Sequence, residues 1–147
     1  MDIKRQSGNQ NEIIFPTFVW TDIIQPNRED LDEIAAQYNL DFYQIKDSIE
    51  HGHLPKFEKQ PNYDFLILRA FTSTIQEGAT TINDLSNKIA FFYNDTKMIT
   101  IHRSSFAFLD HVQVKFSKTE ELLLFLIDKM VQTYQPPLNE LDKQIEE

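Results

Sequence analysis

Apolar and polar residues change their spacing in the middle of the chain, where a helix pattern gives way to a strand pattern. Three apolar residues recur there at spacings of three and four: Phe42, Ile45 and Ile49. Asp41 precedes them and can accept hydrogen bonds from the free amides of a first turn, so the pattern predicts a short helix. Gly52 suits the end of this helix, because a residue with φ above zero closes many helices, and Pro55 cannot continue it.

Shorter apolar runs bounded by turn residues predict the strands of a sheet. These runs cover residues 13–15, 18–23, 63–71, 88–93 and 98–102, with a half-exposed run around Phe57. The run at 63–71 is apolar enough for a strand that is covered on both faces. The last two runs flank residues 94–97 and predict a hairpin. Trp20 is expected to anchor the core, with its indole N–H donating to a carbonyl oxygen.

Further helices are expected before and after these strands. Asn27 is expected to cap a helix that extends to Tyr38, residues 105–114 are expected to form a short helix, and Thr119 is expected to cap a longer one. Two other segments carry weak patterns. Residues 1–11 are expected to be a loose start or an edge strand, and residues 76–81 a loop or the end of a hairpin.

The C-terminal segment carries an apolar stripe that narrows along the chain. Residues 122–127 nearly encircle the helix axis, and a kink or a new helix is expected at Pro136 and Pro137. Beyond the prolines a seam remains, made of Leu138, Leu141 and Ile145. Such a seam requires a partner helix, so we expect the chain to be part of a longer protein. From Thr119 onward seven carboxylates accompany two lysines, which indicates either a solvated face or a surface that attracts cations.

Together these patterns predict an α/β fold. Helices are expected to cover both faces of a mixed β-sheet as an αβα sandwich, followed by a C-terminal helical extension. The 147 residues, with 12 phenylalanines among them, suffice for one core. The predicted division is an α/β domain over residues 1–118 and a helical segment over residues 119–147.

Composition excludes several classes of function. The chain has no cysteine, so disulfides, thiolate zinc sites and cysteine nucleophiles are impossible. No apolar run approaches the ~20 residues that a membrane helix needs. The formal net charge of −9 disfavours nucleic acid and anionic membrane surfaces, and it favours cations as small partners. Sequence motifs of hydrolases, P-loop enzymes and zinc proteases are absent, so we expect no enzyme.

Histidines are the first candidate metal ligands. His51 and His53 flank Gly52 and would point the same way in an extended segment, so they could begin a metal site. The alternative is a solvent-exposed turn, since no thiolate or third ligand is evident beside them. His102 and His111 lie near predicted core elements and are expected to have structural roles.

A run of residues in the central stretch follows a known family pattern in order. Its members are Tyr38, Leu40, Ile45, Asp47, Ile49, Pro55, Lys56, Phe57, Glu58, Tyr63, Phe65, Leu68 and Arg69. This run resembles the cytoplasmic domain of the CorA-type magnesium and cobalt transporters. Residues 18–23 look like the tryptophan strand of that family, and residues 99–102 look like the second strand of its hairpin. The chain departs from the family pattern at Asn39, Asp41, Phe42, Lys46 and Leu54.

The resemblance implies an ion-sensing role for Asp47. In some family members the matching aspartate meets an acid on the stalk helix of a neighbouring subunit around a regulatory divalent ion. Occupancy would hold the subunits of a homopentamer together, and repulsion between the carboxylates would loosen them when the ion leaves. The implied ion is Mg²⁺, with Co²⁺ or Zn²⁺ as alternatives. The opposing interpretation is that Asp47 is merely exposed on its helix, which Lys46, in place of the usual acid, favours.

The resemblance also implies a place in the cell. Residues 119–147 look like the start of an acidic helical hairpin that precedes a stalk and membrane helices, so the domain would lie on the cytoplasmic side of a bacterial inner membrane. Its partners would be divalent metal cations and not nucleic acid, and the isolated chain is expected to be monomeric or weakly associating. The alternative is a free-standing soluble module that docks a protein through its acidic helical end. A reading frame that continues into two apolar runs would favour the transporter.

Overall fold

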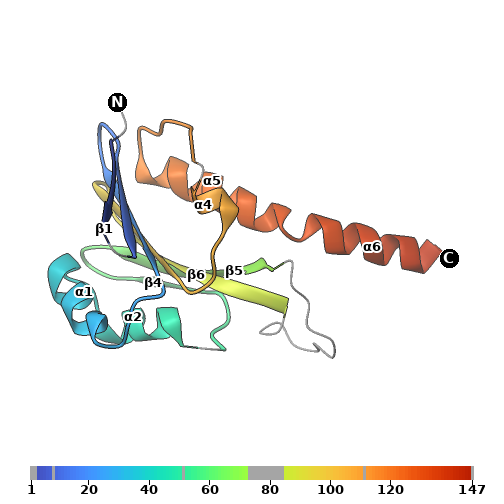
Figure 1. Ribbon diagram of the computed structural model, residues 1–147, viewed down its shortest axis with the longest axis horizontal. Coiled ribbons are helices and arrows are strands. Elements are labelled where there is room, and N and C mark those ends of the chain that lie inside the picture. Colours follow the sequence, from blue (N-terminus) through green and yellow to red (C-terminus); the bar gives the residue numbers. More distant parts are fainter. Residues whose placement is uncertain (1–2, 8, 51, 73–84, 111, 147) are drawn as a thin grey trace.

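The centre of the molecule is a seven-stranded sheet in the order β1-β2-β3-β7-β6-β5-β4 (Figure 1). The computed structural model describes the backbone of residues 3–7, 9–50, 52–72, 85–110 and 112–146, and side chains from residue 9 to residue 145 within these ranges. The strands are β1 (Ile3–Ser7), β2 (Gln10–Ile14), β3 (Val19–Ile24), β4 (Lys56–Lys59), β5 (Asp64–Phe71), β6 (Ser86–Tyr93) and β7 (Lys97–His102). The helices are α1 (Asp30–Tyr38), α2 (Phe42–Ile49), α4 (Ala107–Asp110), α5 (Thr119–Gln132) and α6 (Gln135–Glu146).

The sheet is mixed, as predicted. Neighbouring strands run antiparallel except β3 and β7, which are parallel with Trp20 beside Met98. β6 and β7 form the predicted hairpin, in which Tyr93 lies opposite Met98. β1 is an edge strand, in agreement with one of the two interpretations of residues 1–11. The predicted loop at 76–81 lies outside the described residues.

Alternate side chains of the sheet enter two separate apolar layers. In β5, Phe65 and Ile67 belong to the layer beneath α1 and α2, whereas Leu66 and Leu68 pack on the layer beneath α4 and α5. The two helix pairs accordingly lie on opposite sides of the sheet (Figure 1). The αβα sandwich is therefore confirmed, and so is the prediction that the strand after Tyr63 is packed on both faces.

The C-terminal helices differ in what they contact. α5 buries Leu122 and Leu126 against the sheet, whereas α6 extends beyond the sheet to the C-terminus (Figure 1). The predicted seam of α6 is exposed: Leu138 is 54%, Leu141 49% and Ile145 73% accessible. No helix within the described ranges has both the length and the hydropathy to cross a lipid bilayer. The domain boundary after residue 118 stays a prediction.

The junction between α5 and α6 is bonded to the end of β5. The amide of Phe71 donates to the hydroxyl of Thr133 at 2.8 Å, and the hydroxyl of Tyr134 donates to the backbone oxygen of Arg69 at 3.0 Å. The new helix starts at Gln135, as the two prolines of its first turn require. α6 therefore departs from a base that is tied to the sheet.

The predicted cap of α1 is wrong. Glu29, and not Asn27, holds the N-cap position, and no side chain caps the helix there. Instead the carboxylate of Asp30 accepts a hydrogen bond from the backbone amide of Asn27 at 3.2 Å. A carboxylate inside the first turn thus reaches back toward the preceding chain, and Asn27 lies outside the helix.

The predicted cap of α5 is wrong for a similar reason. Thr119 is the first helical residue, and Lys118 holds the N-cap position. The carboxylate of Glu121 accepts hydrogen bonds from the amides of Ser117 and Lys118, each at 2.9 Å. This is the half of a capping box that the glutamate supplies, so the hydroxyl of Thr119 is not needed.

The predicted helix over 105–114 is much shorter than expected. α4 covers only Ala107–Asp110, and residues 112–116 have no regular structure. Two β-branched residues, Val112 and Val114, follow α4, and such residues lose side-chain freedom in a helix. Phe106 and Leu109 of this segment are buried in the core. His111 lies outside the described residues.

A buried polar network crosses β3 and β7 beneath α4. Trp20 is 1% exposed, which confirms its role in the core, but its indole nitrogen donates to the hydroxyl of Thr100 at 3.0 Å and not to a carbonyl. Strand carbonyls are already bonded in the ladder, which leaves a side-chain hydroxyl as the available acceptor. Thr100 donates in turn to Asp22 Oδ1 at 2.5 Å.

His102 completes this network as a cation. Its Nε2 lies 2.8 Å from Asp22 Oδ1, and its Nδ1 lies 2.6 Å from the carbonyl oxygen of Ser104. Both neighbours are acceptors, so both ring nitrogens must carry a proton. Burial alone would lower the pKa of His102, but the hydrogen bond and charge of Asp22 outweigh burial and raise the pKa above its usual 6.5. The structural role predicted for His102 is thus supported.

This ion pair makes stability depend on pH. A raised folded-state pKa means that the contribution of His102 is complete below about pH 6.5 and is lost as pH rises through the folded-state pKa. We expect the free energy of unfolding to fall as the pH rises above about 6.5, by at most about 1.4 kcal/mol per pH unit from this group. Urea unfolding across this range should show a smaller slope for His102→Gln and for Asp22→Asn. Equal slopes in all three proteins would contradict the assignment.

Candidate metal site

Three side chains with metal-binding atoms converge at the end of α2. One ligand atom from each of Asp47, Glu50 and His53 lies within 4.8 Å of the other two. Asp47 lies in the last turn of α2, and Glu50, three residues later, is the C-cap residue with an extended backbone. Gly52 has a φ of 92°, a value that glycine tolerates without strain, and the chain turns there before His53.

Two lysines orient the carboxylates. Lys56 Nζ lies 2.9 Å from Asp47 Oδ2, and Lys46 Nζ lies 3.4 Å from Glu50 Oε1. The other carboxylate oxygens face the imidazole, with Asp47 Oδ1 at 3.5 Å and Glu50 Oε2 at 3.7 Å from His53 Nε2. Each acid thus presents one oxygen to a lysine and the other to the centre of the cluster. The hydrogen bond from Lys56 to Asp47 is also the main cause that raises the pKa of Lys56.

Two further cations hold the backbone beneath these ligands. The Lys88 ammonium group donates to the carbonyl oxygens of both Asp47 and Glu50, and Arg69 Nη1 donates to the carbonyl oxygen of His53 at 2.9 Å. Burial, assisted by the neighbouring charge of Arg69, lowers the pKa of Lys88 to about 8. Burial likewise lowers the pKa of Arg69. The backbone of every ligand in the cluster is therefore tied to the sheet.

The spacing of these atoms suits a divalent ion. Tetrahedral ligands with bonds of ~2.1 Å lie roughly 3.4 Å apart, close to the separations found between His53 Nε2 and the two carboxylates. Two oxygens and one nitrogen leave further coordination positions for water or for a ligand from another chain.

The structure brings Asp47 and His53 together, although the sequence predicted them as members of two separate sites. His51 lies outside the described residues. Asp47 is not an isolated surface acid, because its side chain is 27% exposed and paired with Lys56. Glu50 was missed by the sequence argument. The regular spacing of three between residues 47, 50 and 53 was the signal that could have found it.

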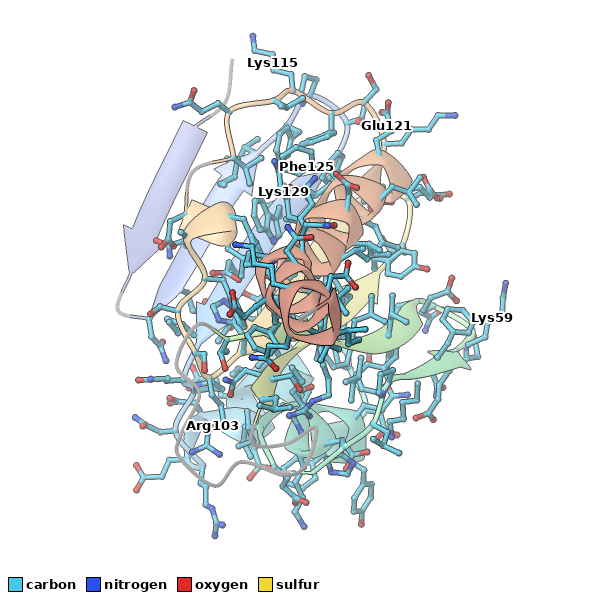
Figure 2. All side chains as sticks on the ribbon, turned by 90° about the vertical axis from the view of Figure 1, so that its right-hand side faces the viewer. Lys59, Arg103, Lys115, Glu121, Phe125 and Lys129 are labelled. Atoms are coloured by element: carbon cyan, nitrogen blue, oxygen red, sulfur yellow. The ribbon has the colours of Figure 1, made fainter. Side chains whose placement is uncertain are left out.

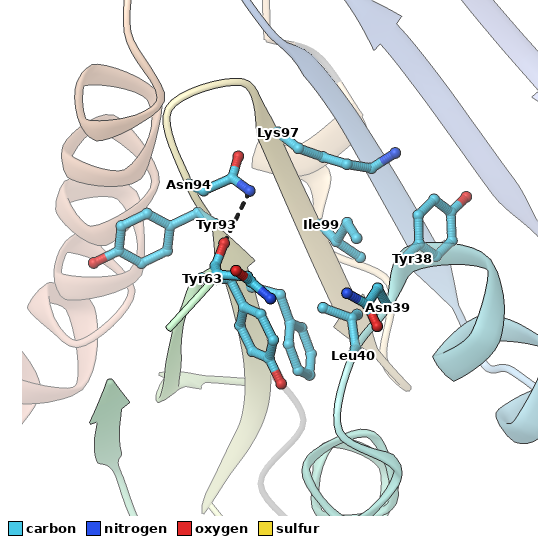
Figure 3. Close-up of a pocket in the computed structure, with 10 residues that line it drawn as sticks. Tyr38, Asn39, Leu40, Tyr63, Tyr93, Asn94, Lys97 and Ile99 are labelled. Carbon is cyan, nitrogen blue, oxygen red and sulfur yellow. Dashed lines mark hydrogen bonds between the residues drawn. The ribbon is translucent and has the colours of Figure 1, made fainter. Parts of the chain in front are cut away.

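Apart from the metal cluster, a cavity lies near the turn of the β6–β7 hairpin (Figure 3). It has a volume of about 220 Å³ and is lined mainly by aromatic, apolar and amide side chains. Tyr38, Tyr63 and Tyr93 surround it, and Asn94 donates to the carbonyl oxygen of Asn62 at 3.1 Å. The described residues that line it include no carboxylate or histidine, so this cavity offers no metal site.

Comparison with known proteins identifies the family. A family model described as CorA-like Mg²⁺ transporter protein matches residues 16–147. No curated protein matches the sequence. Several solved structures share the fold. All those described below are less than 25% identical to the chain, so their similarity shows only that the fold is shared.

Two of these structures are soluble domains. The soluble domain of CorA from Methanocaldococcus jannaschii superposes with a TM-score of 0.69 at 15% identity, covering 88% of this chain and 53% of that one. The ZntB cytoplasmic domain from Vibrio parahaemolyticus superposes with a TM-score of 0.70 at 13% identity, covering 99% of this chain and 63% of that one.

A third is a complete transporter. The complete structure of the CorA magnesium transporter from Methanocaldococcus jannaschii superposes with a TM-score of 0.67 at 13% identity, covering 99% of this chain and 49% of that one. The chain therefore spans between about half and two thirds of the length of these solved relatives. Since the family model covers most of the sequence and the fold agrees with it, the chain belongs to the CorA-like Mg²⁺ transporter family.

Proposed function

We propose that this chain is the ion-sensing domain of a CorA-type divalent-cation transporter. In the full-length protein it would lie on the cytoplasmic side of the membrane, with the membrane helices outside this sequence. The observation that carries the proposal is the convergence of Asp47, Glu50 and His53 at the end of α2, in a member of this family. Besides Asp47, which the sequence resemblance implied, we propose Glu50 and His53 as ligands from the same chain, because their ligand atoms lie close to its carboxylate.

The ligand set bears on which ion is sensed. Mg²⁺ prefers oxygen ligands and keeps several waters, so Asp47 and Glu50 would suffice for it at millimolar concentration. The imidazole of His53 adds a nitrogen ligand, which Co²⁺ and Zn²⁺ accept more readily than Mg²⁺ does. The proposed site is therefore a regulatory Mg²⁺ site that Co²⁺ or Zn²⁺ would occupy more tightly.

Sensing would follow from repulsion between acids. Asp47 and Glu50 face the same centre, and an acid supplied by a neighbouring subunit would add a third negative charge there. An ion that binds only when all these carboxylates are assembled stabilises the assembly by mass action. In the proposed homopentamer, the concentration of the ion would thus bias the packing of subunits.

A second candidate function rests on α6. Leu138, Leu141 and Ile145 form an exposed apolar stripe on a helix that leaves the body of the domain, as in a module that docks another protein. In the transporter proposal the same stripe would pack against a further helix of the longer protein. A gene that encodes two runs of ~20 apolar residues after residue 147 favours the transporter.

Loss of Asp47 should weaken ion binding. We expect Asp47→Ala to raise the Kd for Co²⁺ by at least about tenfold, because a charged ligand is removed from the site. Co²⁺ absorption in the visible range reports the binding directly. Asp32→Ala is the matched control, since Asp32 is an exposed acid of α1 and its replacement changes the net charge equally.

The control separates coordination from general charge. If Asp32→Ala weakens Co²⁺ binding as much as Asp47→Ala does, the ion is held only by the negative field of the chain. A third variant tests the imidazole: His53→Gln should weaken Co²⁺ binding by about tenfold and change Mg²⁺ binding by about twofold or less. Equal effects on both ions would remove His53 from the ligand set.

The regulatory role requires the intact transporter. In that protein, Mg²⁺ should protect the chain against limited proteolysis, because ion binding stabilises the assembled state. Asp47→Ala should abolish this protection and the Mg²⁺ dependence of conductance. Unchanged protection and conductance in the variant would contradict the sensing role, even if the ion binds to the isolated chain.

A further inference from the structure

Three cations form a row across the end of the sheet. Arg69 of β5 lies directly opposite Lys88 of β6 in the antiparallel register. Residues paired in this way project from the same face of a sheet. Arg103 follows the last residue of β7, His102, which pairs with Ile89, and it lines the same pocket as Lys88. Gln25 follows the last residue of β3, and its backbone amide donates to the carbonyl oxygen of His102 at 2.8 Å.

This row lines one wall of a pocket of about 300 Å³. The remaining lining residues are Glu50, Gly52, Asn87 and Ser104. The pocket lies where the apolar layer beneath α2 ends, because Ile67 and Ala90, each two residues from a cation of the row, still belong to that layer. Its volume is at the lower end of those that hold small molecules.

The charges of the row repel one another. Like charges directly opposite each other in a sheet are destabilising, and Lys88 is only 7% exposed. Among the described residues, no carboxylate lies within ion-pair distance of Arg69 or Lys88. Their hydrogen-bond acceptors are neutral oxygens, namely the carbonyl groups of Asp47, Glu50, His53 and Ser86 and the hydroxyl of Ser86.

The carboxylate of Glu50 does not neutralise the row. One of its oxygens lies 3.4 Å from Lys46, and the other lies 3.7 Å from His53. Among the described residues that line the pocket, Arg69, Lys88 and Arg103 are cations and Glu50 is the one anion. This excess stands out in a chain whose formal net charge is −9.

We propose that this pocket binds a phosphate group. Guanidinium groups match the geometry of phosphate oxygens, and an ammonium group adds a point charge. Gln25 also lines the pocket, and its side chain carries a neutral amide donor. A doubly charged phosphate relieves the repulsion along the row, which a singly charged carboxylate does less well. The phosphate comes either as the free ion or as part of a small phosphorylated molecule such as a nucleotide.

The pocket shares Glu50 with the metal cluster, but the proposed binding of phosphate requires no metal ion. Its test therefore uses the full chain in EDTA, at low salt, with inorganic phosphate and AMP as separate probes. Saturable binding with a Kd below about 10 mM is expected for at least one probe by calorimetry. Tighter binding of AMP identifies a phosphorylated molecule as the ligand, and equal binding identifies the phosphate ion.

The variants test the row itself. Arg103 is exposed, so Arg103→Ala should fold, and it should weaken phosphate binding by about tenfold through loss of a charge-assisted contact. Lys115→Ala is the control, since Lys115 is also exposed and lies at the other end of the molecule (Figure 2).

Two results would overturn the proposal. One is the absence of saturable binding of either probe to the unmodified chain. The other is an equal loss of affinity in Lys115→Ala and Arg103→Ala, which would mean that phosphate responds only to the overall charge. The first result includes a binding signal that appears only when a divalent ion is added, because the phosphate would then bind to the metal and not to the cation row.

Discussion

The ammonium group of Lys88 is the contact on which both candidate sites depend. It rises from β6 and donates to the carbonyl oxygens of Asp47 and Glu50, at the end of α2. Carbonyl groups in the last turn of a helix have no partner within the helix, so a cation there satisfies them and opposes the negative end of the helix dipole. The side chains of Asp47 and Glu50 thereby start from a backbone that the sheet holds in place.

At this end of the sheet, positively charged side chains hold the carboxylates of the cluster in place. Lys46 and Lys56 each occupy one oxygen of a carboxylate and leave the other oxygen for the centre of the cluster. Arg69 and Lys88 lie beneath the ligands and face the neighbouring pocket. Glu50 belongs to both places: it is part of the candidate metal cluster, and it also lines the cation-rich pocket. Opposite ligand chemistries thus adjoin along one helix end.

The features that the sequence predicted correctly are those formed by residues close to one another along the chain. Asp41 caps α2 as expected, because its carboxylate reaches amides only two and three residues away. The hairpin of β6 and β7 was predicted for the same reason. The cation row was not predicted, since Arg69 and Lys88 meet only through the register of β5 and β6, which cannot be read from the sequence. The caps at Asn27 and Thr119 failed because a nearby carboxylate made the competing contact.

The bond between Tyr134 and the backbone of Arg69 gives α6 the properties of a lever. The guanidinium group of Arg69 holds the loop of His53, while its carbonyl oxygen holds the base of α6. With 12 residues, α6 is about 18 Å long, so a tilt of roughly 10° at its base would displace its far end by about 3 Å. A small shift of β5 at Arg69 would therefore be amplified into a movement of about 3 Å at the C-terminal end of α6.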